Sequence, residues 1–423
     1  MTSLKFAATF ATATMAFVSI PAAAQYSAPV AAPQTVPVPE TREQSAPTGK
    51  QLKLTPKAQK AIIDLQTAVK AKNGAAIPGL LAAAQAVAKT QDDRYAIGSL
   101  QLQAAIDSND TAGLVTAADV IAANGATAAE TAKIYQFAAQ RFGAAKQYAP
   151  ASAAVDKLLA IDPNNSEAML LKSEMLFQQK RVPDSLAALG QAIDRKKASG
   201  AVPESWYQAR VARAYDAKLP AVYGYSRSWV AAYPSPQHWR DTINIYRNQS
   251  GLDRVALIDM LRLSRATKAL AGEADYTGWA QSLINRGYPA EGLALLQEGA
   301  ASGSINLSSA GVAPLVTSAK TKAPGERGVL AAAGKTALTA ATAKPAMLAA
   351  DGSLDAGDYA QAATLYRAAL GKPGVDRDLA NLRLGEALAQ SGDKAGATAA
   401  LQAVGGTQTE IAQYWLTYLA TRA

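Results

Sequence analysis

The sequence of 423 residues contains no cysteine and only one histidine, His238. Without cysteine the chain cannot form disulfide bonds, thiolate metal sites or a thiol nucleophile, and it cannot carry the cleavage-site cysteine of a lipid-anchored lipoprotein. Metal sites need clustered ligands, and a Ser-His-Asp triad needs a dedicated histidine. His238 stands alone at the expected start of a helix, in SPQHWR, and we expect a structural role for it. The sequence therefore predicts no metal, no cofactor and no catalytic residue.

Long apolar runs are also missing, except for a short one near the start of the chain. Lys5 precedes the apolar residues 6–20, Pro21 ends the run, and three alanines follow it. This order is typical of a secretory signal peptide with small residues at its cleavage site. We predict that residues 1–24 are removed before Gln25 and that the protein works in the periplasm of a bacterium with two membranes. No later run is long enough to span a bilayer, so no transmembrane segment is expected in the mature chain.

Residues 25–53 carry repeated prolines. Proline fixes φ and removes a backbone donor, so neither a helix nor a central strand fits this segment. The composition predicts a proline-rich disordered linker, with a proline-recognition motif as the alternative.

Acidic residues are fewer than basic ones, 33 against 42, and the formal charge is +9. Such an excess can indicate a nucleic-acid partner. Here the basic residues are spread along the chain without a block of like charges, and export would separate the protein from nucleic acid. We predict a solvated basic surface and no nucleic-acid partner. A weak affinity for an anionic cell-wall polymer is the alternative.

From Leu54 onward alanine and leucine dominate, and Gly, Pro, Asn or Asp interrupts the pattern at regular intervals. This composition favours helices of moderate length. Similar segments recur with a period of about 34 residues. In one example, GDYAQAATLYRAAL at 357–370 aligns with GDKAGATAALQAV at 392–404, and small residues recur at Ala362 and Ala397. Small residues allow two helices to approach closely, so the repeat predicts antiparallel helix pairs.

The stretch KLLAIDPNNSEAML at 157–170 marks the change from one pair to the next. Pro163 lacks a backbone donor and disfavours helical geometry at Asp162. Asn165 or Ser166 can cap the following helix. We therefore predict that one helix ends before Asp162 and that another begins near Ser166.

The pattern resembles the tetratricopeptide repeat, which has an aromatic residue early in its first helix, Leu-Gly or Leu-Ala in mid-helix, a glycine turn, and small residues in the second helix. The match is good at 132–199, 273–300 and 343–404. The resemblance implies an all-α, right-handed α-solenoid of about ten antiparallel helix pairs plus a C-terminal capping helix. In that last helix, Ile411, Trp415 and Leu419 would close the exposed end of the stack.

This frame divides the folded part of the chain into four segments. They are degenerate helix-pair repeats at 54–131, repeats with an aromatic and arginine-rich middle at 132–300, an Ala/Gly-rich degenerate pair at 301–342, and repeats with the capping helix at 343–423.

The resemblance also implies a binding surface, because members of this family hold peptides on the concave face formed by first helices. The corresponding partner-binding residues are Gln136, Gln140, Leu170, Glu174, Phe177, Tyr207, Arg210, Val211, Gln281 and Ile284. A known clamp of the family binds a C-terminal carboxylate through Lys and Asn on adjacent first helices. Gln136, Gln140, Leu170 and Glu174 occupy the matching positions, so this clamp is absent.

Aromatic residues make up only 6% of the chain, yet Trp and Tyr gather at 205–247 together with several arginines. Two interpretations fit this enrichment. The aromatic rings can form core between imperfect repeats, with arginine stems covering them. They can instead line a groove that stacks a peptide or sugar.

One stretch imitates a nucleotide-binding motif. GVLAAAGKTALT at 328–339 approximates a phosphate-binding loop, but the spacing between Gly328 and Gly334 is one residue too long and no strand precedes it. We do not assign nucleotide binding to it.

These observations predict a non-catalytic periplasmic scaffold or adaptor that binds a protein or peptide partner. Its expected setting is envelope assembly, secretion or polysaccharide export. The alternative is a cell-wall glycan enzyme or accessory protein with a carboxylate site on its groove.

Overall fold

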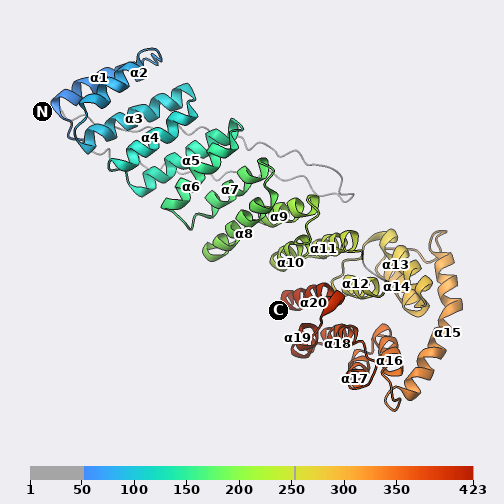
Figure 1. The fold of residues 1–423 in the computed structure, drawn as a ribbon. Coiled ribbons are helices and arrows are strands. Elements are labelled where there is room, and N and C mark those ends of the chain that lie inside the picture. Colours follow the sequence, from blue (N-terminus) through green and yellow to red (C-terminus); the bar gives the residue numbers. More distant parts are fainter. Residues whose placement is uncertain (1–51, 252–253, 423) are drawn as a thin grey trace. The chain divides into compact units, whose positions relative to one another are not determined.

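The computed structural model describes residues 52–251 and 254–422, and this part of the chain consists of helices and their connections, with no strand. The predicted signal peptide and the proline-rich linker up to residue 51 lie outside the described residues. The helices follow one another as antiparallel neighbours (Figure 1). The predicted all-α, helix-pair architecture of the tetratricopeptide type is therefore confirmed.

The chain divides into two compact units, with the boundary between Arg195 and Lys196. The N-terminal unit contains α1 (Pro56–Lys70), α2 (Ile77–Val87), α3 (Gln91–Ser108), α4 (Thr111–Ala123), α5 (Ala128–Ala144), α6 (Tyr148–Ile161), α7 (Ser166–Gln178) and most of α8 (Val182–Ser199). Its core lies between successive helices and is rich in alanine: Ala138 and Ala139 of α5 and Ala151 of α6 are fully buried. Because none of these residues has a long side chain, the helices of a pair approach closely, as the sequence predicts.

Helix starts in this unit are fixed by local side-chain caps. The backbone N–H of Ala168 donates to Oδ1 of Asn165 at 2.9 Å, so Asn165 is the N-cap of α7. The preceding helix α6 ends at Ile161, one residue before Asp162. The predicted helix boundaries around Pro163 are confirmed. Thr127 begins α5 in the same way, in a capping box with Glu130.

The C-terminal unit begins with the end of α8 and continues through twelve further α-helices. They are α9 (Glu204–Asp216), α10 (Val222–Ala232), α11 (Pro236–Gln249), α12 (Arg254–Ala266), α13 (Gly272–Arg286), α14 (Pro289–Ala301), α15 (Ala313–Thr336), α16 (Lys344–Asp355), α17 (Tyr359–Leu370), α18 (Arg377–Ser391), α19 (Lys394–Gln402) and α20 (Thr409–Thr421), with a 3-10 turn at Gly406–Gln408 before α20.

The Ala/Gly-rich segment differs from the predicted degenerate helix pair. Residues 313–336 form one helix of 24 residues, α15, with Pro324 in its interior. The segment has small residues throughout but no capped turn that would divide it, so the helical pattern continues past the proline. Only Ala319 and Ala323 of this helix are buried, which fits its poor match to the repeat.

The last helix buries its apolar face, as predicted: Ile411 and Trp415 are fully buried and Leu419 is 5% exposed. Its neighbours were not anticipated. Besides α19 and α18, helix α20 packs against α10 and α12, which lie far earlier in the sequence. The hydroxyls of Ser226 on α10 and Tyr414 on α20 are 3.4 Å apart. Helix α20 therefore connects the end of the C-terminal unit to its beginning, and this unit is closed on itself (Figure 1).

A glycine substitution tests the close packing of the pairs. A Cβ at Gly385 on α18 would lie 2.5 Å from Cγ of Leu401 on α19, whereas a Cβ at Gly328 on α15 would meet nothing within 4 Å. Alanine is favoured over glycine in a helix by about 1 kcal/mol. We expect Gly328→Ala to stabilise the protein slightly and Gly385→Ala to destabilise it, measured as melting temperatures by circular dichroism. Stabilisation by both substitutions would contradict the packing described here.

Candidate functional site

The predicted partner-binding residues of the N-terminal unit lie on two neighbouring first helices, α5 and α7. The two helices are in contact, because a Cβ at Gly143 would be 3.3 Å from Cε of Met175. Gln136 and Gln140 are exposed on α5. The other three residues of the set are half-buried on α7, at Leu170, Glu174 and Phe177. Glu174 also accepts a hydrogen bond from Nε2 of Gln178 at 2.7 Å. We call these five residues the first-helix face.

The predicted residues in the C-terminal unit are mostly core. Tyr207, Val211 and Ile284 are only 3, 5 and 3% exposed, so their side chains are not accessible to a partner in this structure. The reason is that the corresponding faces of α9 and α13 pack against neighbouring helices. Arg210 is half-buried and its guanidinium lies 3.9 Å from the centre of the Tyr225 ring. The remaining residue, Gln281, is exposed and donates to Asn285.

The aromatic segment at 205–247 is core rather than an open groove. Its tryptophans and several of its tyrosines are buried: Trp206, Tyr207, Trp229, Trp239 and Tyr246. Three of its arginines lie over aromatic rings; for example, Arg247 lies 4.2 Å from the centre of the Trp279 ring. Arg213 is itself buried. His238 belongs to the same packing, with Nδ1 2.7 Å from the carbonyl oxygen of Tyr233 and its ring beside Trp229.

The C-terminal unit contains a polar pocket that the sequence did not predict. It has a volume of about 320 Å³ and lies between α12, α14, α16, α17, α18 and α20. Charged and aromatic side chains form most of its wall: Arg262, Arg265, Glu291, Glu298, Tyr359, Glu386, Trp415, Tyr418 and Arg422. We call it the α20 pocket, because α20 and the residue after it supply Trp415, Tyr418 and Arg422. The pocket therefore depends on the closure of this unit.

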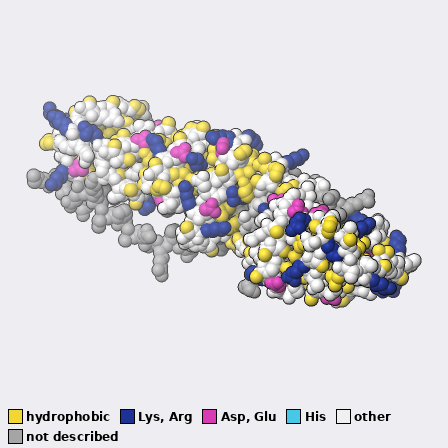
Figure 2. All heavy atoms as spheres, turned by 60° about the horizontal axis from the view of Figure 1, so that its bottom comes forward, with side chains coloured by type: hydrophobic (Ala, Val, Ile, Leu, Met, Phe, Trp, Pro, Cys, Tyr) yellow, Lys and Arg dark blue, Asp and Glu magenta, His cyan; other side chains and the backbone are white. Residues whose placement is uncertain are grey.

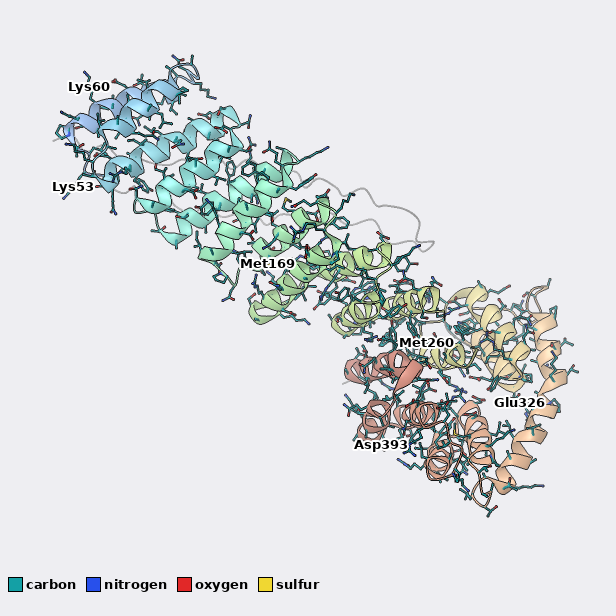
Figure 3. The ribbon with its side chains drawn as sticks, in the orientation of Figure 1. Lys53, Lys60, Met169, Met260, Glu326 and Asp393 are labelled. Atoms are coloured by element: carbon teal, nitrogen blue, oxygen red, sulfur yellow. The ribbon has the colours of Figure 1, made fainter. Side chains whose placement is uncertain are left out.

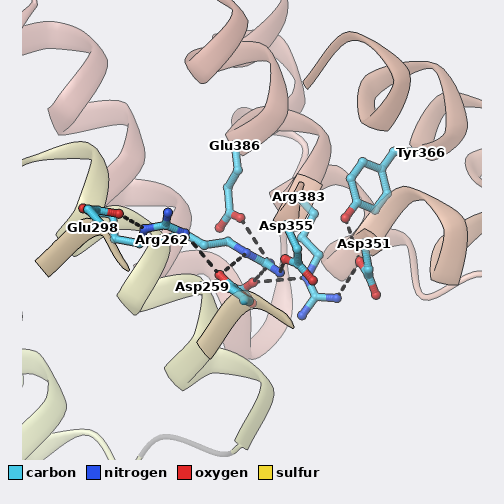
Figure 4. Close-up of polar contacts among 10 residues, drawn as sticks. Asp259, Arg262, Glu298, Asp351, Asp355, Tyr366, Arg383 and Glu386 are labelled. Atoms are coloured by element: carbon cyan, nitrogen blue, oxygen red, sulfur yellow. Dashed lines mark hydrogen bonds and ion pairs between the residues drawn. The ribbon is translucent and has the colours of Figure 1, made fainter. Parts of the chain in front are cut away.

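A buried charge network holds the floor of the α20 pocket in place (Figure 4). Asp259 on α12 accepts hydrogen bonds from Nη1 of Arg262 at 2.9 Å and from Nε of Arg383 at 3.1 Å. Arg262 also donates to Asp355 on α16 at 2.6 Å, and Arg383 on α18 donates to Asp351 at 2.8 Å. The network thus joins three helices of the closed unit through two arginines. Next to it on α12, Met260 is fully buried (Figure 3).

Two glutamates differ from the rest of this network. Glu291 on α14 and Glu386 on α18 are each 1% exposed, and neither carboxyl oxygen of either residue has a hydrogen-bond partner. Their nearest cations are at ion-pair distance: Nη1 of Arg265 is 3.6 Å and Nε of Arg262 is 3.9 Å from Glu291, and Nη1 of Arg262 is 3.6 Å from Glu386. A buried polar atom without a partner is costly. Two donors that line the same pocket, Nε of Arg262 and Nε1 of Trp415, also lack partners, and the indole of Trp415 faces Glu386.

The two glutamates take up protons readily. Burial and, to a smaller extent, the charge of Asp355 raise the pKa of the Glu291 carboxyl to about 8, against the opposing charges of Arg262 and Arg265. Burial likewise raises the pKa of Glu386 well above its usual range, with Asp259 adding to the effect. Around neutral pH Glu291 therefore favours the neutral acid, and the pKa of Glu386 shifts in the same direction. Strongly shifted carboxyls in a pocket are a physical mark of a functional site.

The arginines remain charged. Burial alone would lower the pKa of Arg262, but Asp355 and the other carboxylates around it raise it well above its usual value. The same balance, led by Asp259, raises the pKa of Arg383. The floor of the pocket therefore combines permanent cations with carboxyls whose charge can change.

The pKa of Glu291 gives a pH dependence of stability. Between its ordinary value of 4.5 and about 8, the folded protein keeps a proton that the unfolded chain releases. The free energy of unfolding should therefore fall as the pH rises through this window. Glu291→Gln mimics the neutral acid, and we expect it to reduce the fall measured by urea unfolding at pH 5 and pH 8. Because Glu386 shifts in the same direction, part of the fall should persist. An unchanged slope would contradict the assignment.

Within the described residues, no group of His, Asp and Glu has the arrangement of a metal site. No helix of that part is long and apolar enough to cross a membrane.

The fold defines an all-α helical-repeat protein built from antiparallel helix pairs. No protein-family model matches the chain, and no curated protein sequence matches it. Among solved structures, a chain of the crystal structure of the APC/C hetero-tetramer Cut9-Hcn1 matches with 10% sequence identity. The match covers 82% of this chain and 86% of that chain, but its TM-score is 0.18. A score this low supports no argument, and the fold class stands on the helix pairs described above.

Proposed function

We propose that this protein is an exported, non-catalytic adaptor that holds a partner protein on its helix pairs. The observation that carries the proposal is the first-helix face of α5 and α7. There α5 presents two exposed amides, Gln136 and Gln140, and the next first helix, α7, presents the half-buried Phe177. Exposed hydrogen-bonding groups next to partly accessible apolar groups are what a protein interface requires.

The setting that we propose is the bacterial periplasm, with a role in envelope assembly, secretion or polysaccharide export. Its support is the signal-like sequence of residues 1–24. An exported chain without disulfides must fold on its packing alone, and the alanine-rich helix pairs provide such packing.

Photo-crosslinking in the envelope tests the proposal. A crosslinking amino acid at Gln136 or Gln140 should capture one partner reproducibly. The same probe at Ala153, an exposed position on the second helix α6, is the matched control and should capture much less. Equal capture from all three positions, or none from any of them, would contradict the adaptor proposal. Tyr207 is unsuitable as a probe position because it is buried.

A glycan enzyme is the alternative, and the buried acids Glu291 and Glu386 are the residues it would use. Both residues line the α20 pocket but are only 1% exposed, so neither offers an accessible carboxyl on an open groove to a sugar chain. We therefore expect no release of sugars from purified cell wall. Turnover that Glu291→Gln abolishes would replace the adaptor proposal by the enzyme.

An anionic cell-wall polymer is the other alternative partner. Figure 2 shows Lys and Arg side chains scattered over one face of the molecule among acidic and apolar groups, without one dominant basic patch. Binding to such a polymer would weaken steeply with added salt, because it would depend on exposed charges. We expect the partner of the first-helix face to be retained at moderate salt.

A further inference from the structure

We propose that the α20 pocket binds an organic cation, a primary ammonium or guanidinium group, between the carboxyls of Glu291 and Glu386. This inference goes beyond the adaptor function, because the α20 pocket lies in the C-terminal unit and the first-helix face in the N-terminal one.

The first argument is the charge balance in and around the pocket. Six carboxyl groups meet four arginines there: Asp259, Glu291, Glu298, Asp351, Asp355 and Glu386 against Arg262, Arg265, Arg383 and Arg422. A buried carboxyl without a matching cation either takes up a proton or binds a cation from outside. When Glu291 and Glu386 are ionised, six carboxylates face four arginines, and this excess of negative charge favours a cationic ligand over an anionic one.

The second argument is the set of unsatisfied atoms. Four carboxyl oxygens, two on Glu291 and two on Glu386, lack hydrogen-bond partners, and both residues line the pocket. An ammonium group offers three donors and a guanidinium five. The arginines of the pocket reach these oxygens only at 3.6–3.9 Å, as ion pairs longer than a hydrogen bond. Their shorter bonds go to Asp259 and Asp355 from Arg262 and to Glu298 from Arg265.

The third argument is the nature of the walls. Trp415, Tyr418 and Tyr359 contribute aromatic surface to the pocket, and aromatic faces attract organic cations. The buried residues lie at the floor, whereas Glu298 and Arg265, with side chains 40 and 27% exposed, form the rim. Carboxyls at the bottom and rings along the sides suit the charged end and the alkyl stem of a lysine-like group.

A hard metal ion would need several oxygen ligands in a fixed shell, and the described residues hold no such group.

Binding should exchange a proton for the cation. Glu291 faces Asp355, Arg262 and Arg265, and Glu386 faces Asp259, Arg262, Arg383 and the indole of Trp415. In the empty pocket these surroundings favour the neutral acid, so the cation must release a proton from a glutamate before it gains full contact. Affinity should therefore rise with pH below about 8, by up to about tenfold per pH unit for each proton released.

Calorimetry on the full-length protein tests the proposal. The probe is n-butylammonium chloride, and n-butanol of the same shape is the neutral control. We expect the amine to bind and the alcohol not to bind. We also expect amine affinity to increase at least fivefold from pH 6 to pH 7.5, with heats that depend on the ionisation enthalpy of the buffer. A blocked peptide, acetyl-Gly-Lys-Gly-amide, and free 1,5-diaminopentane then show whether the site prefers a side chain of a partner protein or a free amine.

Three variants make the test specific. Glu291→Gln and Glu386→Gln should each weaken amine binding at least tenfold. Glu273→Gln, at an exposed glutamate of the same unit outside the pocket, should leave it unchanged. Each variant is first checked for native tryptophan emission and helical circular dichroism. No amine binding by the folded protein at pH 6 to 8, or binding that neither pocket variant weakens, would overturn the proposal. Crosslinking from the first-helix face would be unaffected by that result, so the two proposals can fail separately.

Discussion

Replacing Arg383 with methionine should lower the free energy of unfolding of the C-terminal unit by about 3–5 kcal/mol, because removal of one partner leaves buried carboxylates without their cation. The Arg383 side chain is 3% exposed and pairs with Asp259 at 3.1 Å and Asp351 at 2.8 Å. All five tryptophans lie after Arg195, so urea unfolding followed by tryptophan fluorescence reports on this unit selectively.

The matched control for Arg383 lies on the same helix. Arg377 at the start of α18 is exposed and donates only to the carbonyl of Leu370. Arg377→Met should change the free energy of unfolding by no more than about 0.5 kcal/mol. Similar losses for both variants, or a loss below about 1 kcal/mol for Arg383→Met, would show that the network is solvated rather than buried.

The second large effect is expected at Trp415, which is fully buried where α20 meets the rest of the C-terminal unit. Trp415→Ala should cost about 3–5 kcal/mol, because it removes a large buried side chain and leaves a cavity. The four remaining tryptophans still report the transition. Leu338→Ala is the control, because Leu338 is 61% exposed and its truncation removes little buried surface. If the two substitutions have equal effects, α20 is not packed as described.

The repeats could be predicted because their determinants are local. Pro163, Asn165 and Ser166 set the end of one helix and the start of the next within a few residues. Small residues such as Ala362 and Ala397 mark the close contacts of each pair at a fixed spacing. Both kinds of signal recur with every repeat, so they can be read without knowledge of the tertiary structure.

The closure of the C-terminal unit could not be predicted in this way. The contact between Ser226 and Tyr414 joins residues 188 positions apart. An apolar face on a last helix predicts burial, but its pattern does not say which helices will cover it. The repeat frame also assigned Tyr207, Val211 and Ile284 to a surface, but neighbouring helices cover their faces of α9 and α13. Tyr207 packs against Tyr233, and Ile284 lies beside Gly292 of α14.

The charge network did leave a signal in the sequence. Arg383 and Glu386 interrupt an otherwise apolar helix in ANLRLGEALA, and Asp259 and Arg262 do the same in LIDMLRL. Charged residues on a core-facing side require buried partners. Their spacing of three residues pairs them within a helix, but the contacts between α12, α16 and α18 depend on the fold of the whole unit.

The central claim is that α20 returns to α10 and closes the C-terminal unit around its pocket. Because the chain lacks cysteine, spin labels attach only at cysteines that are introduced. A double variant carries one label at Ser228→Cys on α10 and one at Gln413→Cys on α20, and both positions are exposed. Packed helices lie about 10 Å apart, so pulsed electron paramagnetic resonance should give a narrow distribution at roughly 15–30 Å once the label arms are included. In an open stack, five helix pairs at about 10 Å each would separate the labels by about 50 Å. A distribution centred there would contradict the closed unit.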